Sequence, residues 1–316
     1  MSSTTSKDTM TPIQLAIAGV GKIVYDQHAP AIRGNPDFQL VATASRNHGI
    51  EGVTAYKSMA EMLAGASAIE AISLCMPPQY RYEAARDALR AGKHVFLEKP
   101  PGATLSEVES LKSLAAQQGV TLLASWHSRH APAVQVVKRH LQQHAPRQVK
   151  VIWREDVRHW HPDQEWIWQP GGLGVFDPGI NALSIVTEIL PQTMFLTQAV
   201  LEVPANRQTP IAARLAFTDA LGTDIQADFD WRQTGEQTWD IIIETDSTHV
   251  HLKKGGHELW INNLQSELPV EGEYPSLYQH FSTLIRTRTS DVDVAPLRHV
   301  ADAFMLGQHI VTEAFV

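Results

Sequence analysis

AIAGVGKIVYDQHAPAI, residues 16–32, follows an apolar run and places two glycines ahead of a helix-forming stretch. Gly19 can make the tight turn after a strand, and Gly21 lets backbone N–H groups approach a pyrophosphate at the N-terminus of the next helix. Val24 replaces the third glycine of a dinucleotide-binding turn, whose main role is close packing of the helix on the strand. Because a generic strand, turn and helix can also contain two glycines, the surrounding sequence has to decide between the two interpretations.

Strands and helices alternate around this turn as far as about residue 125. Short apolar runs predict buried strands at 13–19, 39–45, 68–76, 94–99 and 120–125. Amphipathic stretches between them predict helices near 26–34, 58–65, 80–91 and 104–118. Strands that are apolar on both faces and alternate with helices are typical of a doubly wound parallel sheet. We therefore predict a Rossmann domain over residues 1–126, in which a dinucleotide binds at Gly19, Gly21, Lys22 and Ile23.

After residue 126 the pattern changes to runs with period-two alternation and few helices. Following a helix near 131–144, strands are predicted at 148–156, 193–203, 210–217, 224–231, 239–245, 249–254 and 258–262. Further helices are predicted at 178–190, 275–289 and 296–315. In the run 224–231, Ala227, Phe229 and Trp231 face one way, and Asp228 and Asp230 face the other. The predicted fold class is α/β, with a second, α+β domain over residues 127–316 that has a large, mostly antiparallel sheet. Its C-terminal helices have room to pack back on the first domain.

Composition excludes several classes of function. The 316 residues include 26 Lys and Arg against 34 Asp and Glu, a formal net charge of −8, and no basic block, so a nucleic-acid partner is not expected. The single cysteine, Cys75, can form no internal disulfide, and no Cys/His spacing indicates a metal site. Residues 1–11 lack the apolar core of a signal peptide, and no run of about 18 apolar residues occurs. We expect a cytoplasmic protein without a membrane partner.

The end of the second predicted strand indicates which dinucleotide is bound. NAD enzymes usually have Asp or Glu there to hold the ribose 2′-hydroxyl, whereas this chain has Ser45 and Arg46. The Arg46 guanidinium can hydrogen-bond a 2′-phosphate, so NADP is the expected cofactor, with NAD possible. The alternative is that Arg46 is a surface residue without a ligand.

A second segment, LRAGKHVFLEKPPGATLSEVESL at 89–111, resembles the glucose–fructose oxidoreductase / inositol dehydrogenase (Gfo/Idh/MocA) family of NAD(P)-dependent sugar enzymes. The order of features fits over almost the whole chain: the glycine turn, MPP at 76–78, EKP at 98–100 and DPGIN at 177–181. The stretches WHSR and WREDVRHWHP are similar to the L-arabinose/D-galactose 1-dehydrogenase branch of this family. The resemblance implies cofactor contacts at Met76, Pro77, Glu98 and Lys99.

Lys99 is the first candidate catalytic residue. It lies at the carboxyl end of a predicted parallel strand, where open α/β sheets bind ligands, and the prolines that follow it turn the chain away. Its ammonium could orient the C1 hydroxyl of a sugar, with Glu98 positioning it. The alternative is a lysine that is merely solvated.

Asp177 and Asn181 are the other two candidates, since a spacing of four residues places them on one face of a helix start. A helix N-cap is the alternative role for Asp177. The wider family commonly has histidine in place of Asn181, and an amide cannot accept a proton at neutral pH. The resemblance therefore implies Asp177 as the base and Asn181 as its hydrogen-bond partner, and leaves open whether Asp177 or Lys99 takes the proton. Arg81 is a second departure, because many members have histidine there.

Sugar recognition needs aromatic faces for C–H patches and polar groups for hydroxyls. Among 15 histidines and 8 tryptophans, any single residue is more often structural than ligand-binding, so position beside the family motifs selects the candidates. The predicted substrate-binding residues are Lys99, His127, Glu155, Trp160, His161, Asp177, Asn181 and Trp239.

The resulting hypothesis is an aldose 1-dehydrogenase that transfers hydride from C1 of L-arabinose, D-galactose or D-fucose to NADP⁺ and gives the lactone. Two alternatives remain open at this point: a sugar- and dinucleotide-binding regulator without turnover, and an aldose–aldose oxidoreductase that retains its cofactor. The exposed face of the second sheet is a candidate homodimer surface.

Overall fold

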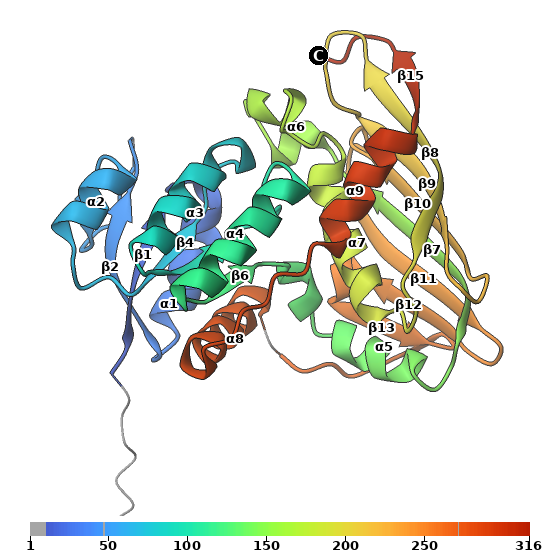
Figure 1. Cartoon of the computed structure of the whole chain (residues 1–316). Coiled ribbons are helices and arrows are strands. Elements are labelled where there is room, and N and C mark those ends of the chain that lie inside the picture. The colour runs from blue at the N-terminus through green and yellow to red at the C-terminus, as the bar shows by residue number, and fades with distance from the viewer. Residues whose placement is uncertain (1–10, 47, 271) are drawn as a thin grey trace, which may run out of the picture.

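The computed structural model describes residues 11–46, 48–270 and 272–316, and contains two sheets with helices packed on them (Figure 1). The first sheet is parallel, has the strand order β3-β2-β1-β4-β5-β6 and is doubly wound, as predicted. Its strands are β1 (Ile13–Ala18), β2 (Phe38–Ala44), β3 (Thr54–Tyr56), β4 (Ala71–Leu74), β5 (His94–Leu97) and β6 (Leu122–Ala124). The sequence pattern gave no indication of β3, which is short and has no buried residue.

Helices connect these strands and cover the sheet. A π-helical turn at Val24–His28 follows the glycine turn, and the fully buried Val24 fills the position of the third glycine. The helices are α1 (Ala29–Arg33), α2 (Met59–Gly65), α3 (Arg81–Arg90) and α4 (Leu105–Gln118), with a short 3-10 helix at Pro78–Tyr80. The start of α4 is fixed by a capping box between Thr104 and Glu107.

The second sheet is mixed and mostly antiparallel, as predicted, in the order β14-β13-β12-β11-β7-β10-β9-β8-β15. The pairs β7–β10 and β8–β15 are parallel. Ala227, Phe229 and Trp231 are buried, in agreement with the predicted alternation. Its strands are β7 (Pro146–Arg154), β8 (Phe195–Pro204), β9 (Ala212–Thr218), β10 (Asp224–Asp230), β11 (Thr238–Thr245), β12 (His249–Lys253), β13 (Glu258–Ile261), β14 (Leu264–Gln265) and β15 (Gln308–Thr312).

Among the described residues after β6, four helices accompany the second sheet, and one packs on the first. The four are α5 (Val134–Leu141), α6 (Val157–Trp160), α7 (Phe176–Ile189) and α9 (Ala295–Leu306), with short 3-10 helices at His127–His130, Glu165–Trp168 and Lys254–Gly256. Helix α8 (Glu273–Thr287) lies beside the first sheet instead (Figure 1), where Tyr278 stacks on Phe96 and Phe281 on Phe38. In the described part of the chain, none of the helices has the length and apolar character needed to cross a bilayer.

The predicted helix over 296–315 is wrong beyond residue 306. At Gly307 the backbone becomes extended (φ −69°, ψ 134°), and a Cβ there would lie 2.4 Å from the carbonyl oxygen of Ala303. Residues 308–312 instead form β15 and extend the sheet by pairing with β8. Apolar residues on either side of Gly307 fit both a helix and a strand, so the sequence pattern did not identify the break.

Candidate active site

A cleft of about 510 Å³ lies where the chain leaves β1, β4 and β5 and is also lined by residues from the later part of the chain, between His127 and Trp239. Of the residues predicted from the sequence, Gly19, Ser45 and Arg46 lie outside its lining. The others all line it: Gly21, Lys22, Ile23, Met76, Pro77, Glu98, Lys99, His127, Glu155, Trp160, His161, Asp177, Asn181 and Trp239. The cleft therefore brings together residues from both halves of the chain.

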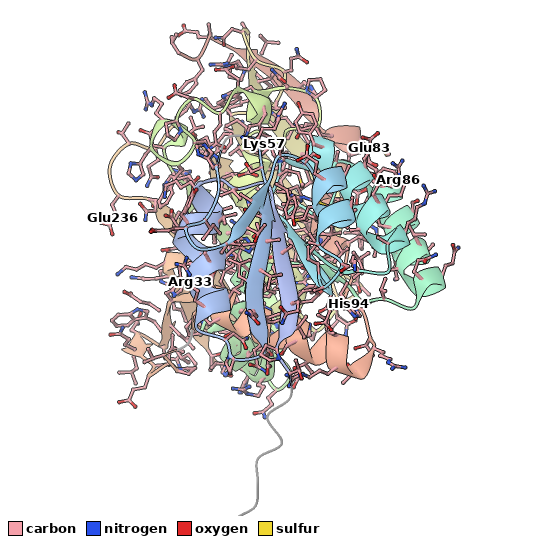
Figure 2. The ribbon with its side chains drawn as sticks, turned by 90° about the vertical axis from the view of Figure 1, so that its left-hand side faces the viewer. Arg33, Lys57, Glu83, Arg86, His94 and Glu236 are labelled. Atoms are coloured by element: carbon pink, nitrogen blue, oxygen red, sulfur yellow. The ribbon has the colours of Figure 1, made fainter. Side chains whose placement is uncertain are left out.

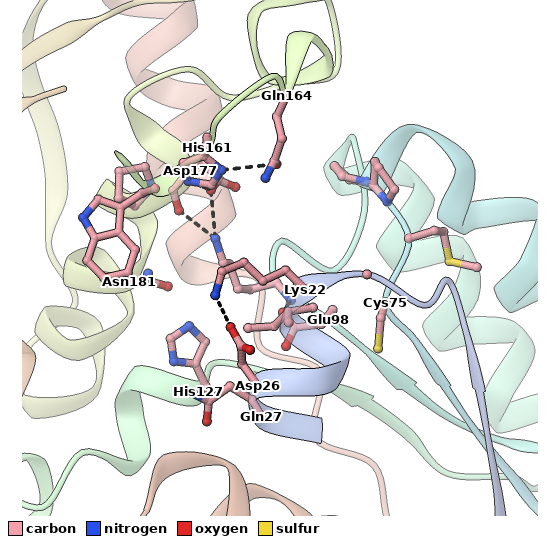
Figure 3. A pocket seen from close by; sticks show the side chains of 18 of the residues that line it. Lys22, Asp26, Gln27, Cys75, Glu98, His127, His161, Gln164, Asp177 and Asn181 are labelled. Atoms are coloured by element: carbon pink, nitrogen blue, oxygen red, sulfur yellow. Dashed lines mark hydrogen bonds and ion pairs between the residues drawn. The ribbon is translucent and has the colours of Figure 1, made fainter. Parts of the chain in front are cut away.

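The glycine turn has the geometry expected at a dinucleotide site. Gly19 has φ +83°, and an added Cβ would lie 2.6 Å from the backbone nitrogen of Met76, so only glycine fits there. At Gly21, an added Cβ would meet no atom of the described residues within 4 Å, and the backbone is open to the cleft. The approach of a pyrophosphate requires a closely packed first glycine, here Gly19, and an unobstructed second glycine, here Gly21. Lys22 forms an ion pair with Asp26 at the mouth of the cleft (Figure 3).

Ser45 and Arg46 directly follow β2, beside the strand that precedes the glycine turn. The Arg46 side chain is exposed and Ser45 is half-buried. Tyr25, which sequence reasoning did not single out, donates a hydrogen bond to the carbonyl oxygen of Gly49 (2.8 Å) and so connects the turn to the segment after β2. Because the Arg46 side chain is exposed, its guanidinium is accessible to a ligand.

Lys99 follows β5, and its backbone is held by Glu98. The Lys99 N–H donates to Glu98 Oε2 (2.6 Å), while Glu98 Oε1 accepts from Tyr274 (2.6 Å) and lies 3.2 Å from His28 Nε2. Burial alone would raise the pKa of Glu98, but His28 and Tyr274 outweigh it and lower the pKa to about 2. Glu98 is therefore an ionised, buried anchor for the lysine. The peptide bond between Lys99 and Pro100 is cis.

The Lys99 ammonium meets Asp177 across the cleft. Its Nζ lies 3.1 Å from Asp177 Oδ2 and donates to the backbone oxygen of the same residue (3.0 Å). His161 Nε2 lies 3.3 Å from the same carboxylate oxygen (Figure 3). Burial would raise the pKa of Asp177, but Lys99 and His161 hold it below its ordinary value. Burial lowers the pKa of His161, so this imidazole is neutral at neutral pH.

Helix α7 positions both Asp177 and Asn181. The helix begins at Phe176 and its N-cap is Val175, so the alternative of Asp177 as the N-cap is wrong. Asn181 lies one turn further on and lines the same cleft. Within the described residues, the side-chain amide of Asn181 takes part in no hydrogen bond. It is available to a ligand.

Glu155 is a buried carboxyl group held by two indoles. Trp231 Nε1 donates to Oε1 (3.1 Å), and Trp239 Nε1 donates to Oε2 (2.9 Å). Burial raises the pKa of Glu155 to about 7, although both indole hydrogen bonds oppose this. Glu155 therefore changes protonation state near neutral pH, inside the cleft.

Aromatic rings form the wall beside Glu155. Trp160 is partly exposed and packs against Trp239, with ring centroids 5.4 Å apart, and Trp239 stacks on Trp153 at 5.9 Å. His127 also lines the cleft; its Nδ1 is 2.5 Å from Glu273 Oε2, and its ring stacks on Tyr274. The cleft therefore combines flat apolar faces with convergent polar groups, as a sugar site requires.

Several residues that hold this site together were not predicted from the sequence. Gln164 accepts from Trp166 Nε1 (3.2 Å) and lies 3.3 Å from His161 Nδ1. His28 and Tyr274 contact Glu98 from distant parts of the chain, and no local pattern could have identified them. Arg81 stood out only as a departure from the family pattern. No group of three or more His, Cys, Asp or Glu within 11–46, 48–270 and 272–316 is arranged to hold a metal ion.

Comparisons with known proteins identify relatives of this chain. The model of an oxidoreductase family with an NAD-binding Rossmann fold, Gfo/Idh/MocA, matches residues 13–125. Galactose 1-dehydrogenase of Pseudomonas fluorescens is 44% identical over 306 residues, which cover 97% of this chain and 99% of that protein. The crystal structure of D-galactose-1-dehydrogenase from Rhizobium etli has 62% identity and a TM-score of 0.94, with 97% of this chain and 99% of that chain covered.

A more distant structure shares the fold alone. A 3-ketoreductase from Actinomadura kijaniata, in complex with NADP and TDP-benzene, has 19% identity and a TM-score of 0.85. The similarity covers 96% of this chain and 100% of that one. The fold with its two sheets is therefore shared by a protein with little sequence in common with this chain.

Proposed function

Because this chain belongs to the Gfo/Idh/MocA family of oxidoreductases, we propose that it is an aldose 1-dehydrogenase that oxidises D-galactose, L-arabinose and D-fucose with NADP⁺. The reaction removes a hydride from C1 of the cyclic sugar and a proton from the oxygen of its C1 hydroxyl. The product is a lactone, which hydrolyses outside the site. The observation that carries the proposal is the meeting of Lys99, Asp177 and His161 beside the open amide of Asn181. The galactose 1-dehydrogenases that resemble this chain over nearly its full length support the choice of sugar.

The first domain supplies the cofactor site in this proposal. Gly21, Lys22 and Ile23 would hold the pyrophosphate, and Met76 and Pro77 would line the cleft beside it. Ser45 and Arg46 would bind the 2′-phosphate, which favours NADP over NAD. When bound, the cofactor would supply the nicotinamide ring as acceptor for the hydride of C1.

We assign the proton of the C1 hydroxyl to the Asp177 carboxylate. As the C–H bond gives up its electron pair, the O–H electron pair becomes the second bond of C1=O, and the proton passes to Asp177. Lys99 contacts a carboxylate and a carbonyl, which suits an ammonium donor rather than a neutral amine acceptor. Its charge would stabilise the negative charge that develops on the C1 oxygen. Asn181 would orient the same hydroxyl group.

The second domain supplies the sugar site. Glu155 and His161 would bind ring hydroxyls, and Trp160 and Trp239 would face the C–H patches of the pyranose. His127 borders the cleft on the side of α8 and can reach a further hydroxyl. Directed hydrogen bonds of this kind distinguish sugars by the configuration of each hydroxyl.

We further propose a homodimer formed through the outer face of the second sheet. The half-buried Ile152 on β7 and Ile242 on β11 lie on this face and would pack against the same face of a second copy. Light scattering tests this, and a monomer at micromolar concentration would contradict it.

The free thiol of Cys75 is compatible with a reducing compartment such as the cytoplasm.

The direct test mixes the protein with NADP⁺ and D-galactose and follows NADPH absorbance, with hydroxylamine added to trap the lactone. Continuous turnover with lactone formation is expected. Sugar binding without NADPH would instead indicate a regulator. Reduction that stops after one equivalent per chain would indicate an oxidoreductase that retains its cofactor.

A further inference from the structure

Arg81 is a buried arginine whose guanidinium, among the residues that the structure describes, hydrogen-bonds only to backbone carbonyls. It is the first residue of α3 and is 2% exposed. One terminal nitrogen, Nη1, donates to the carbonyl oxygens of Glu98 and Pro100, and the other, Nη2, donates to that of Met76. Three carbonyls from two different strand ends therefore converge on one guanidinium.

This contact set is unusual because a buried charge normally has a carboxylate partner. In the described part of the chain, no carboxylate lies within ion-pair distance of the guanidinium, and its Nε has no hydrogen-bond partner. Burial lowers the pKa of Arg81 to about 10, with Glu98, Cys75 and Asp177 opposing the shift, so the residue still has its charge at neutral pH. An apolar side chain would avoid the cost of burying this charge.

The three carbonyls identify the backbone segments that the Arg81 guanidinium holds in place. Glu98 and Pro100 are the two neighbours of Lys99, so Arg81 fixes the backbone on both sides of the lysine. The Lys99 N–H is already bound to the Glu98 carboxylate. Met76 lies beyond the end of β4, in the loop that lines the cleft beside β5. The planar guanidinium of Arg81 thus connects this loop to the segment that contains Lys99.

Resting on the function proposed above, we propose that Arg81 is a positioning residue, which fixes the Lys99 backbone so that the ammonium meets the Asp177 carboxylate. A displacement of a reacting group by about 1 Å can lower a rate by about a hundredfold. Lysine at position 81 would keep a charge but could not reach all three carbonyls, because an ammonium is compact, whereas the guanidinium presents donors from separate nitrogens in one plane.

The test compares Arg81→Lys and Arg81→Gln with the matched control Arg86→Gln, whose side chain projects outward from the same helix (Figure 2). The glutamine variant keeps a planar donor and removes the buried charge, so it is expected to fold. For each protein one measures kcat and KM for D-galactose, the Kd of NADP⁺ by tryptophan fluorescence, and the thermal midpoint. All assays are made well below the lowest midpoint.

We expect both Arg81 variants to lose at least tenfold in kcat, with KM and the Kd of NADP⁺ changed less than about threefold, while Arg86→Gln is unaffected. A crystal structure of Arg81→Gln should show the contact between Lys99 and Asp177 broken. Unchanged kcat in folded Arg81 variants would overturn the proposal, as would failure of both variants to fold, which would make the residue purely structural. Absence of turnover in the unmodified protein would overturn the proposed function instead, so the two failures are distinguishable.

Discussion

The Nζ atom of Lys99 lies 3.1 Å from Oδ2 of Asp177, although the lysine follows a strand of the first sheet and the aspartate begins a helix on the second. Both groups are largely buried, so removing either partner takes away the main counter-ion of the other. The ion pair therefore connects the end of β5 to the start of α7 at the place where we expect the sugar C1 to react.

Lys99→Ala should lower kcat by on the order of a hundredfold or more, because the charge on the C1 oxygen loses its ammonium partner. The Kd of NADP⁺ should change little, since the side chain acts on the sugar hydroxyl and not on the phosphates. Steady-state kinetics and fluorescence titration measure the two quantities, and Lys112→Ala, exposed on α4, is the control. A variant that kept half of its activity would exclude Lys99 from the reaction.

Asp177→Asn should be at least as severe, with kcat lowered by about a hundredfold or more at every pH, because the amide cannot accept the C1 proton. The low pKa of Asp177 predicts that the native enzyme loses this base only in acid, below the ordinary range of a carboxyl group. The check is a profile of kcat against pH for both proteins. Substantial activity of Asp177→Asn at high pH would assign the proton to Lys99.

Arg46→Ala should weaken NADP⁺ by about ten- to a hundredfold, since a charged hydrogen bond contributes roughly 1.5–3 kcal/mol. NAD⁺, which lacks the 2′-phosphate, should bind almost unchanged. Titration of both cofactors into the variant tests this, with Arg33→Ala, exposed at the end of α1, as the control (Figure 2). An equal loss for both cofactors would mean that Arg46 supports the fold rather than the site.

Glu155 should give the enzyme a pH dependence near neutrality. Its pKa of about 7 means that the carboxyl is neutral below this value and ionised above it, and the ionised form accepts hydrogen bonds from sugar hydroxyls more strongly. Therefore kcat/KM for D-galactose should rise as the pH increases through about 7.

The matching variant is Glu155→Gln, which cannot ionise and points an amide N–H at one of the two indole donors. It should have a lower kcat/KM and no inflection at this pH. Glu109→Gln, exposed on α4, should keep the inflection. Persistence of the inflection in Glu155→Gln would assign it to another group.

The sequence predicted the fold and much of the cleft for identifiable physical reasons. Runs that are apolar on both faces predicted the parallel sheet, and carboxyl ends of parallel strands lie at one edge, which places Gly21, Met76 and Lys99 together. The helix spacing of Asp177 and Asn181 placed both on one face.

The remaining features depend on contacts between distant segments. The hydrogen bond of Tyr274 to Glu98 joins residues 176 positions apart, and no local pattern reports such a pair. Arg81 donates to carbonyls whose positions depend on how the strands and loops pack. The positions of the two indoles that donate to Glu155 depend on the same packing. The same holds for β15, whose place in the sheet depends on its pairing with β8.

The central claim, an aldose 1-dehydrogenase for sugars with the galactose configuration, is tested most directly by kcat/KM values with NADP⁺ for four sugars. D-Galactose, L-arabinose and D-fucose have the same configuration at C2, C3 and C4, so a site that binds these hydroxyls should oxidise all three. D-Glucose inverts C4 and leaves a buried polar partner unpaired, at a cost of about 1–3 kcal/mol, so it should be poorer by at least about tenfold. A kcat/KM for D-glucose equal to or above that for D-galactose would contradict the account.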